Sequence, residues 1–212
     1  MSGCCDSSDY EDVFSDKRAT KDLKSYRRKG LDRLAKAMVE FLGPDAAGAT
    51  VLEVGGGIGA IQNALLDHGA ASAVNIELSK GYETAAMDLA AEAGVVDKVQ
   101  RVHGDFVEMT VAPADIVVMN RVVCCYPDME AMMAAAADRA TSTLAMVFPR
   151  DRWFMRALRR IIAVERRLRR NTFRFYVHDP DLIVGEATAR GLKLSFTRRT
   201  AGWQAVILQR SP

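Results

Sequence analysis

Residues 51–59 read VLEVGGGIG, and residues 60–68 continue the chain as AIQNALLDH. An apolar run at residues 50–54 breaks into glycines, after which apolar residues recur at helical spacing. Glycine has no side chain, so the backbone can turn sharply there and come close to a ligand. The stretch therefore predicts a strand, a tight turn and a helix, with a binding site at the turn.

The same alternation of apolar strand and helix continues along the chain. We expect strands at residues 50–54, 73–76, 99–102, 116–120, 143–148, 192–198 and 203–209, and helices at residues 60–68, 82–93, 129–139 and 180–190. Short apolar strands separated by helices are typical of a parallel sheet, whereas the short link before the last strand favours an antiparallel hairpin. The predicted fold class is α/β: a Rossmann-like open sheet of seven strands, mostly parallel with an antiparallel C-terminal hairpin, with helices on both faces.

The N-terminal part of the chain reads as helical. Apolar side chains recur at helical spacing over residues 17–42, interrupted only at Gly30, and Gly43-Pro44 ends the pattern. We expect residues 1–45 to form a helical lid over a main domain at residues 46–212.

The composition of the chain limits the classes of protein to which it can belong. The 212 residues carry a formal net charge of +2, which gives no global attraction to nucleic acid. The sequence shows neither a secretory leader nor an apolar run near the roughly 20 residues that cross a bilayer. The cysteines form two adjacent pairs, Cys4-Cys5 and Cys124-Cys125, which is not the spacing of a disulfide framework. We expect a cytoplasmic protein with reduced thiols.

The glycine loop alone fits two cofactors. Gly55 and Gly57 satisfy a loose dinucleotide fingerprint, and Glu77, about 20 residues further on, can accept both ribose hydroxyls at the end of the second strand. This interpretation predicts an NAD(P)-dependent oxidoreductase.

Neighbouring residues favour a cationic nucleoside instead. Glu53 places an anion beside the loop, where a pyrophosphate would be repelled and a sulfonium would be attracted. After the third strand, the Asp105 carboxylate can accept from an adenine amine and the Phe106 ring can cover the base. The closing hairpin also replaces the second mononucleotide half of a dinucleotide enzyme.

These residues resemble the class I S-adenosylmethionine-dependent methyltransferases, whose Glu-x-Gly-x-Gly-x-Gly loop matches residues 53–59. The resemblance implies a methionine moiety over the glycine loop, a ribose on the acidic residue after the second strand, and an adenine beside the acidic residue after the third. The residues concerned are Glu53, Gly55, Gly57, Gly59, Glu77, Asp105 and Phe106. Within the family, the chain is most similar to magnesium-protoporphyrin O-methyltransferases and related small-molecule enzymes, through residues 26–30 and the glycine loop.

The acceptor is expected beyond the fourth strand, because ligands lie outside the carboxyl ends of parallel strands. Asn120 and Arg121 can hydrogen-bond the donor or the acceptor, Tyr126 can form an apolar wall, and His178 can act as a general base or only cap a turn. Cys124-Cys125 could hold zinc or a metalloid, but adjacent cysteines on a strand point to opposite faces, so we predict buried thiols and no metal.

Ten arginines lie between residues 150 and 174, interspersed with apolar side chains. Such a helix, expected at residues 151–170, is usually a solvated face over an apolar stripe. It could also recognise an acidic acceptor or make peripheral contact with anionic lipid. Nucleic acid is disfavoured because no recognisable binding module accompanies the arginines.

The sequence thus predicts an enzyme that transfers a methyl group from S-adenosylmethionine to a small-molecule acceptor at oxygen, with Asn120, Tyr126 and His178 as candidate catalytic residues. Two alternatives remain at this point, an NAD(P)-dependent oxidoreductase and a non-catalytic S-adenosylmethionine-binding protein. Methyl transfer from a sulfonium depends largely on alignment and exclusion of water, so the sequence marks the donor more clearly than the catalyst.

Overall fold

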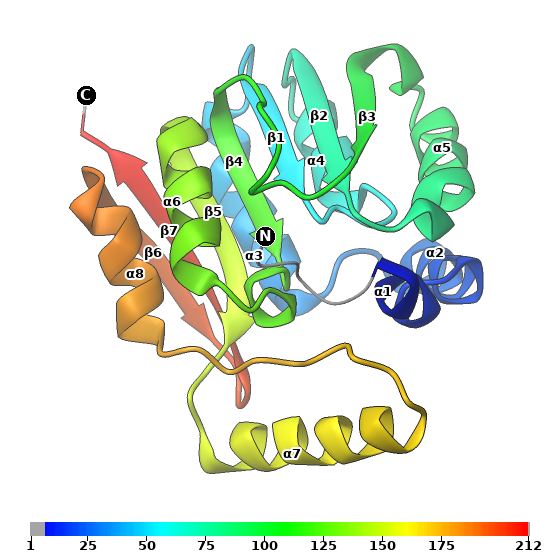
Figure 1. Ribbon diagram of the computed structural model, residues 1–212. Coiled ribbons are helices and arrows are strands. Elements are labelled where there is room, and N and C mark those ends of the chain that lie inside the picture. Colours follow the sequence, from blue (N-terminus) through cyan, green and yellow to red (C-terminus); the bar gives the residue numbers. More distant parts are fainter. Residues whose placement is uncertain (1–6, 212) are drawn as a thin grey trace.

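The computed structural model describes residues 7–211 and builds them around one seven-stranded sheet (Figure 1). The strand order is β3-β2-β1-β4-β5-β7-β6; the first five strands are parallel, and β7 runs antiparallel to both β5 and β6. The strands are β1 (Thr50–Val54), β2 (Ser72–Glu77), β3 (Val99–His103), β4 (Ala114–Asn120), β5 (Ala140–Pro149), β6 (Leu192–Arg199) and β7 (Trp203–Arg210). The predicted fold class is confirmed.

Helices cover both faces of the sheet (Figure 1). They are α1 (Ser7–Val13), α2 (Asp16–Lys29), α3 (Arg33–Leu42), α4 (Ala60–Asp67), α5 (Glu83–Glu92), α6 (Met129–Arg139), α7 (Trp153–Leu168) and α8 (Pro180–Ala189), with short 3-10 turns η1 (Gly43–Asp45), η2 (Lys80–Tyr82), η3 (Val96–Lys98) and η4 (Val123–Cys125). Helices α6 and α8 pack on one face, and α3 and α4 pack on the other. No helix within residues 7–211 is both long and apolar enough to cross a membrane.

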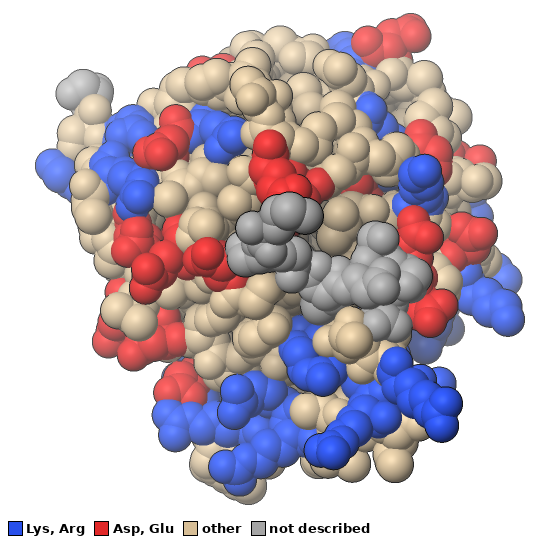
Figure 2. All heavy atoms as spheres, in the orientation of Figure 1, with Lys and Arg blue, Asp and Glu red and all other residues tan. Residues whose placement is uncertain are grey.

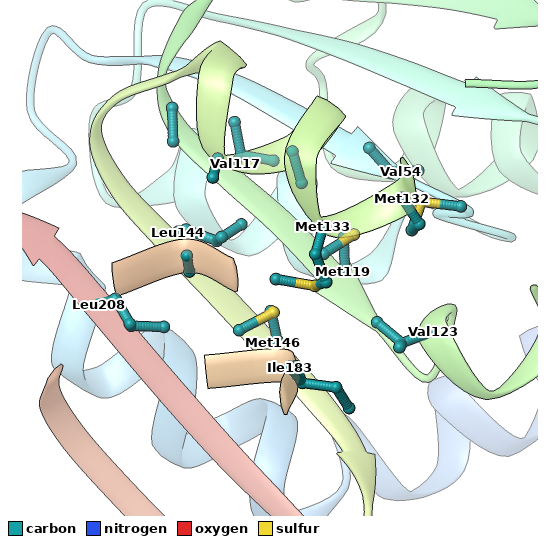
Figure 3. Packing of buried hydrophobic residues seen from close by; sticks show 14 of the residues in the cluster. Val54, Val117, Met119, Val123, Met132, Met133, Leu144, Met146, Ile183 and Leu208 are labelled. Atoms are coloured by element: carbon teal, nitrogen blue, oxygen red, sulfur yellow. The ribbon is translucent and has the colours of Figure 1, made fainter. Parts of the chain in front are cut away.

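The core consists of two apolar layers separated by the sheet. Along β5, Leu144 and Met146 point toward α6 and α8, whereas Ala145 and Val147 point toward α3 and α4. Figure 3 shows Met146 packed between Met119 of the neighbouring strand and Ile183 of α8. Both faces of the central strands are therefore buried, which explains why their sequences are continuously apolar.

The N-terminal segment differs from the predicted lid in two ways. Helix α3 is part of the main body, because Leu34, Met38 and Leu42 are buried in the layer under the sheet. Helix α1 precedes residues 17–42, where the helical spacing was found. Its position depends on rings distant in sequence, since the Phe173 ring lies 6.1 Å from Tyr10 of this helix and 5.6 Å from Phe14 directly after it, measured between centroids.

The strand order reverses beside β1, whose neighbours are β2 on one side and β4 on the other. The connections from β1 and from β4 leave in opposite directions there, so a crevice opens at the carboxyl ends of these strands. The glycine loop follows β1 at this point.

We expect Leu144→Ala to lower the free energy of unfolding by about 2–5 kcal/mol, because it opens a cavity in a fully buried layer. Urea denaturation measures the change. Leu194→Ala is the matched control, since that side chain is 55% exposed and its loss should change little. Equal effects of the two substitutions would contradict the packing described here.

Candidate functional site

The glycine loop is a bend of bare backbone at the end of β1. Gly55, Gly57 and Gly59 all have positive φ angles, which residues with side chains rarely adopt. A Cβ on Gly55 would lie 2.6 Å from Val122 Cγ2, and one on Gly57 would lie 3.2 Å from the Tyr82 ring. Both conformation and space therefore favour glycine. The N–H groups of Gly55, Gly57 and Gly59 donate to the carbonyl of Ile76, to the Glu77 carboxylate and to the carbonyl of Gly56, so the loop has a fixed shape.

Glu77 ends β2 and holds this bend in place. Its side chain is buried, with one carboxylate oxygen accepting from the Gly57 N–H at 2.9 Å and the other from the Ser79 N–H at 3.0 Å. Burial raises the pKa of Glu77, while these two N–H groups oppose the shift. The carboxylate that the sequence assigned to a ribose thus lies directly under the glycine loop.

Glu53 is also buried, and it accepts from the Gln62 N–H of α4 at 3.0 Å. Burial raises its pKa to about 8. This corrects the sequence analysis, which treated Glu53 as an anion, because the group is largely protonated at neutral pH. The nearby Arg101, which the sequence analysis missed, opposes the rise in the pKa values of both glutamates.

A cavity of about 340 Å³ opens beneath these groups, a size suited to a small molecule. Its lining comes from the glycine loop, the ends of β2 and β4, and helices α1, α2 and α3. Asn120, at the end of β4, contributes a buried Oδ1 atom with no hydrogen-bond partner. An unpaired buried oxygen is costly, so this atom marks a position where a bound donor group would be stabilised.

A second, more apolar cavity adjoins the first through Gly55, Val122 and Cys125, which line both. Asp105, Phe106 and Tyr126 line this second cavity. The Tyr126 hydroxyl donates to Asp105 at 3.0 Å, and the other Asp105 oxygen accepts from the Val107 N–H at 2.9 Å. Asp105 thus both caps a turn and lines a mostly apolar pocket.

The structure does not bring the three candidate catalytic residues together. Asn120 lines the larger cavity, whereas Tyr126 lines only the adjoining one. His178 lines neither; its Nε2 lies 3.0 Å from the Tyr126 carbonyl oxygen, and its ring stacks on Tyr176. Burial lowers the pKa of His178. This contact joins the segment after α7 to the turn that carries Tyr126.

The described cysteine pair also differs from expectation. Cys124 and Cys125 lie in the turn η4, not on a strand, so their sulfurs are 3.8 Å apart and both approach the Arg121 carbonyl oxygen. Within residues 7–211, no three potential ligands gather in a geometry that could hold a metal ion. Cys4 and Cys5 lie outside the described residues.

Arg121 projects from the end of β4 into the cavity lining. Its backbone has a φ of 63°, one of two such non-glycine positions among the described residues, and its N–H donates to the Val147 carbonyl at 2.8 Å. The guanidinium pairs with Asp32 at 3.1 Å and lies over the Trp203 ring, 5.0 Å from its centroid. A strained backbone here aims a cation at the cavity.

Helix α2 is fixed over the opposite wall by contacts that the sequence did not reveal. The Tyr82 hydroxyl donates to Asp22 at 2.7 Å, and Arg18 pairs with the same carboxylate. Burial and Asp22 together raise the pKa of Tyr82, so the phenol stays protonated and keeps donating. Within residues 26–30, Arg27 pairs with Glu92, whereas Tyr26 lines the cavity.

Residues 44–136 match a protein family described as O-methyltransferase domain. None of the curated proteins compared with the chain matches it. Among solved structures, magnesium protoporphyrin IX methyltransferase from Synechocystis PCC 6803 with bound SAH is 20% identical, with a TM-score of 0.69 over 84% of this chain and 82% of its own.

Two further structures are similar. An O-methyltransferase family protein from Burkholderia thailandensis is 18% identical, with a TM-score of 0.69 over 94% of this chain and 64% of its own. An O-methyltransferase family 2 protein from Planctomyces limnophilus DSM 3776, in complex with apigenin, is 16% identical, with a TM-score of 0.67 over 92% of this chain and 62% of its own. At these identities the structures establish the fold.

The match of residues 44–136 to an O-methyltransferase domain bears out the prediction of a methyltransferase that uses S-adenosylmethionine, and the similar structures bear out the predicted fold. The oxidoreductase alternative is set aside by the same match. The residues present fit this donor, because the bend has no room for side chains, Glu77 lies beneath it, and the Asn120 oxygen lacks a partner.

We expect Glu77→Ala to weaken binding of S-adenosylmethionine by about 1–3 kcal/mol, the cost of leaving the ribose hydroxyls and the Gly57 N–H without a charged acceptor. Isothermal titration calorimetry measures the affinity. Glu40→Ala, on the exposed side of α3, is the control. Unchanged affinity in a folded Glu77→Ala protein would remove this residue from the donor site.

The raised pKa of Glu53 makes stability depend on pH. Between the ordinary value of 4.5 and about 8, the native state keeps a proton that the unfolded chain releases. Raising pH through this window should therefore lower the free energy of unfolding, and Glu53→Gln should remove that part of the decrease. Urea denaturation of the two proteins across the window provides the measurement; parallel curves would contradict the assigned pKa.

Proposed function

We propose that this methyltransferase transfers the methyl group of S-adenosylmethionine to an oxygen of a small, acidic acceptor that arrives already ionised. The observation that carries the proposal is Arg121, a cation aimed into the donor cavity from the end of β4. An arginine fork matches a carboxylate in geometry and charge.

The donor half of the proposal uses the residues under the bend. We assign the ribose to Glu77, the methionine moiety to the backbone of Gly55, Gly57 and Gly59, and a hydrogen bond to the unpaired Asn120 oxygen. The adenine is assigned to the adjoining cavity, between Asp105 and the apolar residues around it. Glu53 lines the larger cavity, where a nearby cation would favour its ionised form.

Arg121 can turn to the acceptor because its present partner is weakly held. Its ion pair with Asp32 is exposed, with 43% and 39% of the two side chains accessible. Such pairs contribute at most about 1 kcal/mol, so a substrate carboxylate can replace Asp32 at little cost. The stacking of the guanidinium on Trp203 keeps its plane oriented during the exchange.

An ionised acceptor also fits a cavity whose possible bases are already engaged. Among the described residues of its lining there is neither histidine nor lysine, Asp22 and Asp32 hold side-chain partners, and Glu53 and Glu77 accept from backbone N–H groups. A carboxylate or phenolate oxygen needs no deprotonation. It attacks the methyl carbon in line, a C–O bond forms as the C–S bond breaks, and the bonding electrons return to sulfur, which leaves a neutral thioether and a methylated oxygen.

The similar proteins support a small acceptor. One is a methyltransferase of magnesium protoporphyrin IX, and another was crystallised with apigenin. Both compounds are small molecules built of rings. We extend to this chain only the chemical class, a compact molecule with an acidic oxygen.

Three further predictions belong to this proposal. We keep a lid at the N-terminus within residues 1–45, but restrict the moving part to α1 and α2, since α3 is buried in the core. We keep a cytoplasmic location, supported by the spacing of the four cysteines, which is not that of a disulfide framework. We also keep peripheral membrane contact through residues 151–170, supported by the exposed side of α7.

We expect Arg121→Asn to raise the KM for an acidic acceptor by the equivalent of about 1.5–3 kcal/mol while donor affinity stays unchanged. Asparagine tolerates the left-handed backbone at this position, so the substitution tests charge and not strain. Arg198→Asn, on the exposed strand β6, is the matched control.

The assay follows labelled methyl transfer to a panel of paired acceptors, each offered as the free acid or phenol and as its amide or methyl ether. Transfer to the acidic member of a pair supports the proposal. Tight binding of S-adenosylmethionine without methyl transfer to any acceptor would favour a non-catalytic binding protein. Equal transfer to the charged and uncharged members of each pair would contradict the proposed role of Arg121.

A further inference from the structure

Helix α7 carries a row of exposed apolar side chains along one side. Trp153, Ile161 and Leu168 are 80%, 66% and 81% exposed, and Val164 is 60% exposed. With Ala157 these residues recur at every third or fourth position, so they share one side of the helix. Isolated exposed apolar residues are ordinary, but a continuous row is not.

The opposite side attaches α7 to the body of the protein. Met155 is the only buried residue of the helix, and it packs so closely on Gly202 that a Cβ there would lie 2.8 Å from the sulfur. In helical geometry Met155 projects away from the row of Trp153, Ile161 and Leu168. The apolar row therefore faces outward, and no described residue covers it.

Arginines accompany this row. Helix α7 contains five arginines and one glutamate, and Arg156, Arg160 and Arg167 lie beside the apolar row by helical geometry. Figure 2 shows Lys and Arg side chains gathered over the lower part of the molecule, where α7 lies in Figure 1. The outer surface of α7 is therefore both apolar and strongly cationic.

We propose that α7 lies in the surface of an anionic lipid bilayer. The apolar row would insert among the lipid headgroups and upper acyl chains, and the flanking arginines would pair with lipid phosphates. A helix with a large apolar side, a basic flank and a terminal tryptophan is the type that binds in the plane of a membrane. A second copy of the chain is a poorer occupant, because its arginines would repel these at close range.

The position of α7 would link lipid binding to the donor cavity. The helix follows the carboxyl end of β5, the same edge of the sheet at which the donor cavity opens. Its first turn packs on Gly202, next to Trp203, which stacks on Arg121 of the cavity lining. Binding to lipid would bring the acceptor side of the cavity close to the membrane surface. The lipid contact itself does not depend on the proposed acceptor chemistry.

Flotation of the full chain with vesicles tests the proposal. We expect binding to phosphatidylglycerol vesicles, weaker at high salt, and little binding to phosphatidylcholine vesicles. Trp153 fluorescence should shift to shorter wavelength on binding. The double substitution Ile161→Ser with Leu168→Ser should abolish flotation, whereas the matched pair Leu182→Ser with Leu194→Ser, at similarly exposed sites away from α7, should retain it.

The charge contribution is tested separately. Arg160→Gln with Arg167→Gln should lower the vesicle partition coefficient about 5-fold per arginine, since each basic residue near an anionic surface adds roughly 1 kcal/mol. Arg198→Gln with Arg199→Gln on β6 is the control pair. Circular dichroism and S-adenosylmethionine affinity should stay unchanged in all four variants, which shows that they fold and that the donor site is separate.

Three results would overturn the proposal. One is failure of the native chain to bind anionic vesicles. The second is flotation that persists in the Ile161→Ser, Leu168→Ser variant. The third is a native chain that does not float but that self-associates in sedimentation, or binds RNA, in a way that the α7 variants abolish. Each identifies a different occupant of α7 or none.

Discussion

The site depends on a buried carboxylate that holds a bend of bare backbone. Glu77 accepts from Gly57 across the gap between β2 and the loop after β1, and this bond joins the two strands at the place where the sheet reverses its strand order. Without this hydrogen bond, the loop would lose one of the contacts that restrict the wide conformational range of its glycines. The crowding of Val122 and Tyr82 against the loop completes the constraint by excluding every side chain.

Electrostatics at this bend are arranged in favour of a cation. Two glutamates are buried beside the cavity, and burial alone raises the pKa of each. Their compensation comes from backbone N–H groups and from Arg101, whose side chain is nearly inaccessible and pairs with Glu83. A positively charged nucleoside would favour the ionised form of both glutamates, whereas an anionic pyrophosphate would oppose it, which agrees with the O-methyltransferase domain match.

Much of this could be predicted from the sequence, because local patterns determine local structure. The periodicity of residues 50–148 gave the strand and helix order, and the glycine loop with Glu77 located the donor cavity. Contacts between distant residues could not be predicted. Helix α1 depends on Phe173, and the pairing of Tyr82 with Asp22 joins segments 60 residues apart.

The errors have equally physical causes. Glu53 was assigned a charge because sequence reveals residue type and not burial, and its pKa follows burial. Cys124-Cys125 was treated as part of a strand, although the chain had already turned at Arg121 into η4. For His178 the sequence left two roles open, a general base and a turn cap, because a contact between residues 52 positions apart, with the Tyr126 carbonyl oxygen, could not be predicted from it.

Asp32 performs two tasks with separate oxygen atoms. Its Oδ1 caps the first turn of α3 by accepting from Leu34 and Ala35, and its Oδ2 pairs with Arg121. If the Arg121 guanidinium pairs with another anion, α3 keeps its N-terminal cap. The only interaction lost is the exposed ion pair of Asp32. The start of α3 therefore offers the Arg121 guanidinium a fixed partner that it can leave, and the packing of the core beneath α3 does not depend on whether this ion pair is formed.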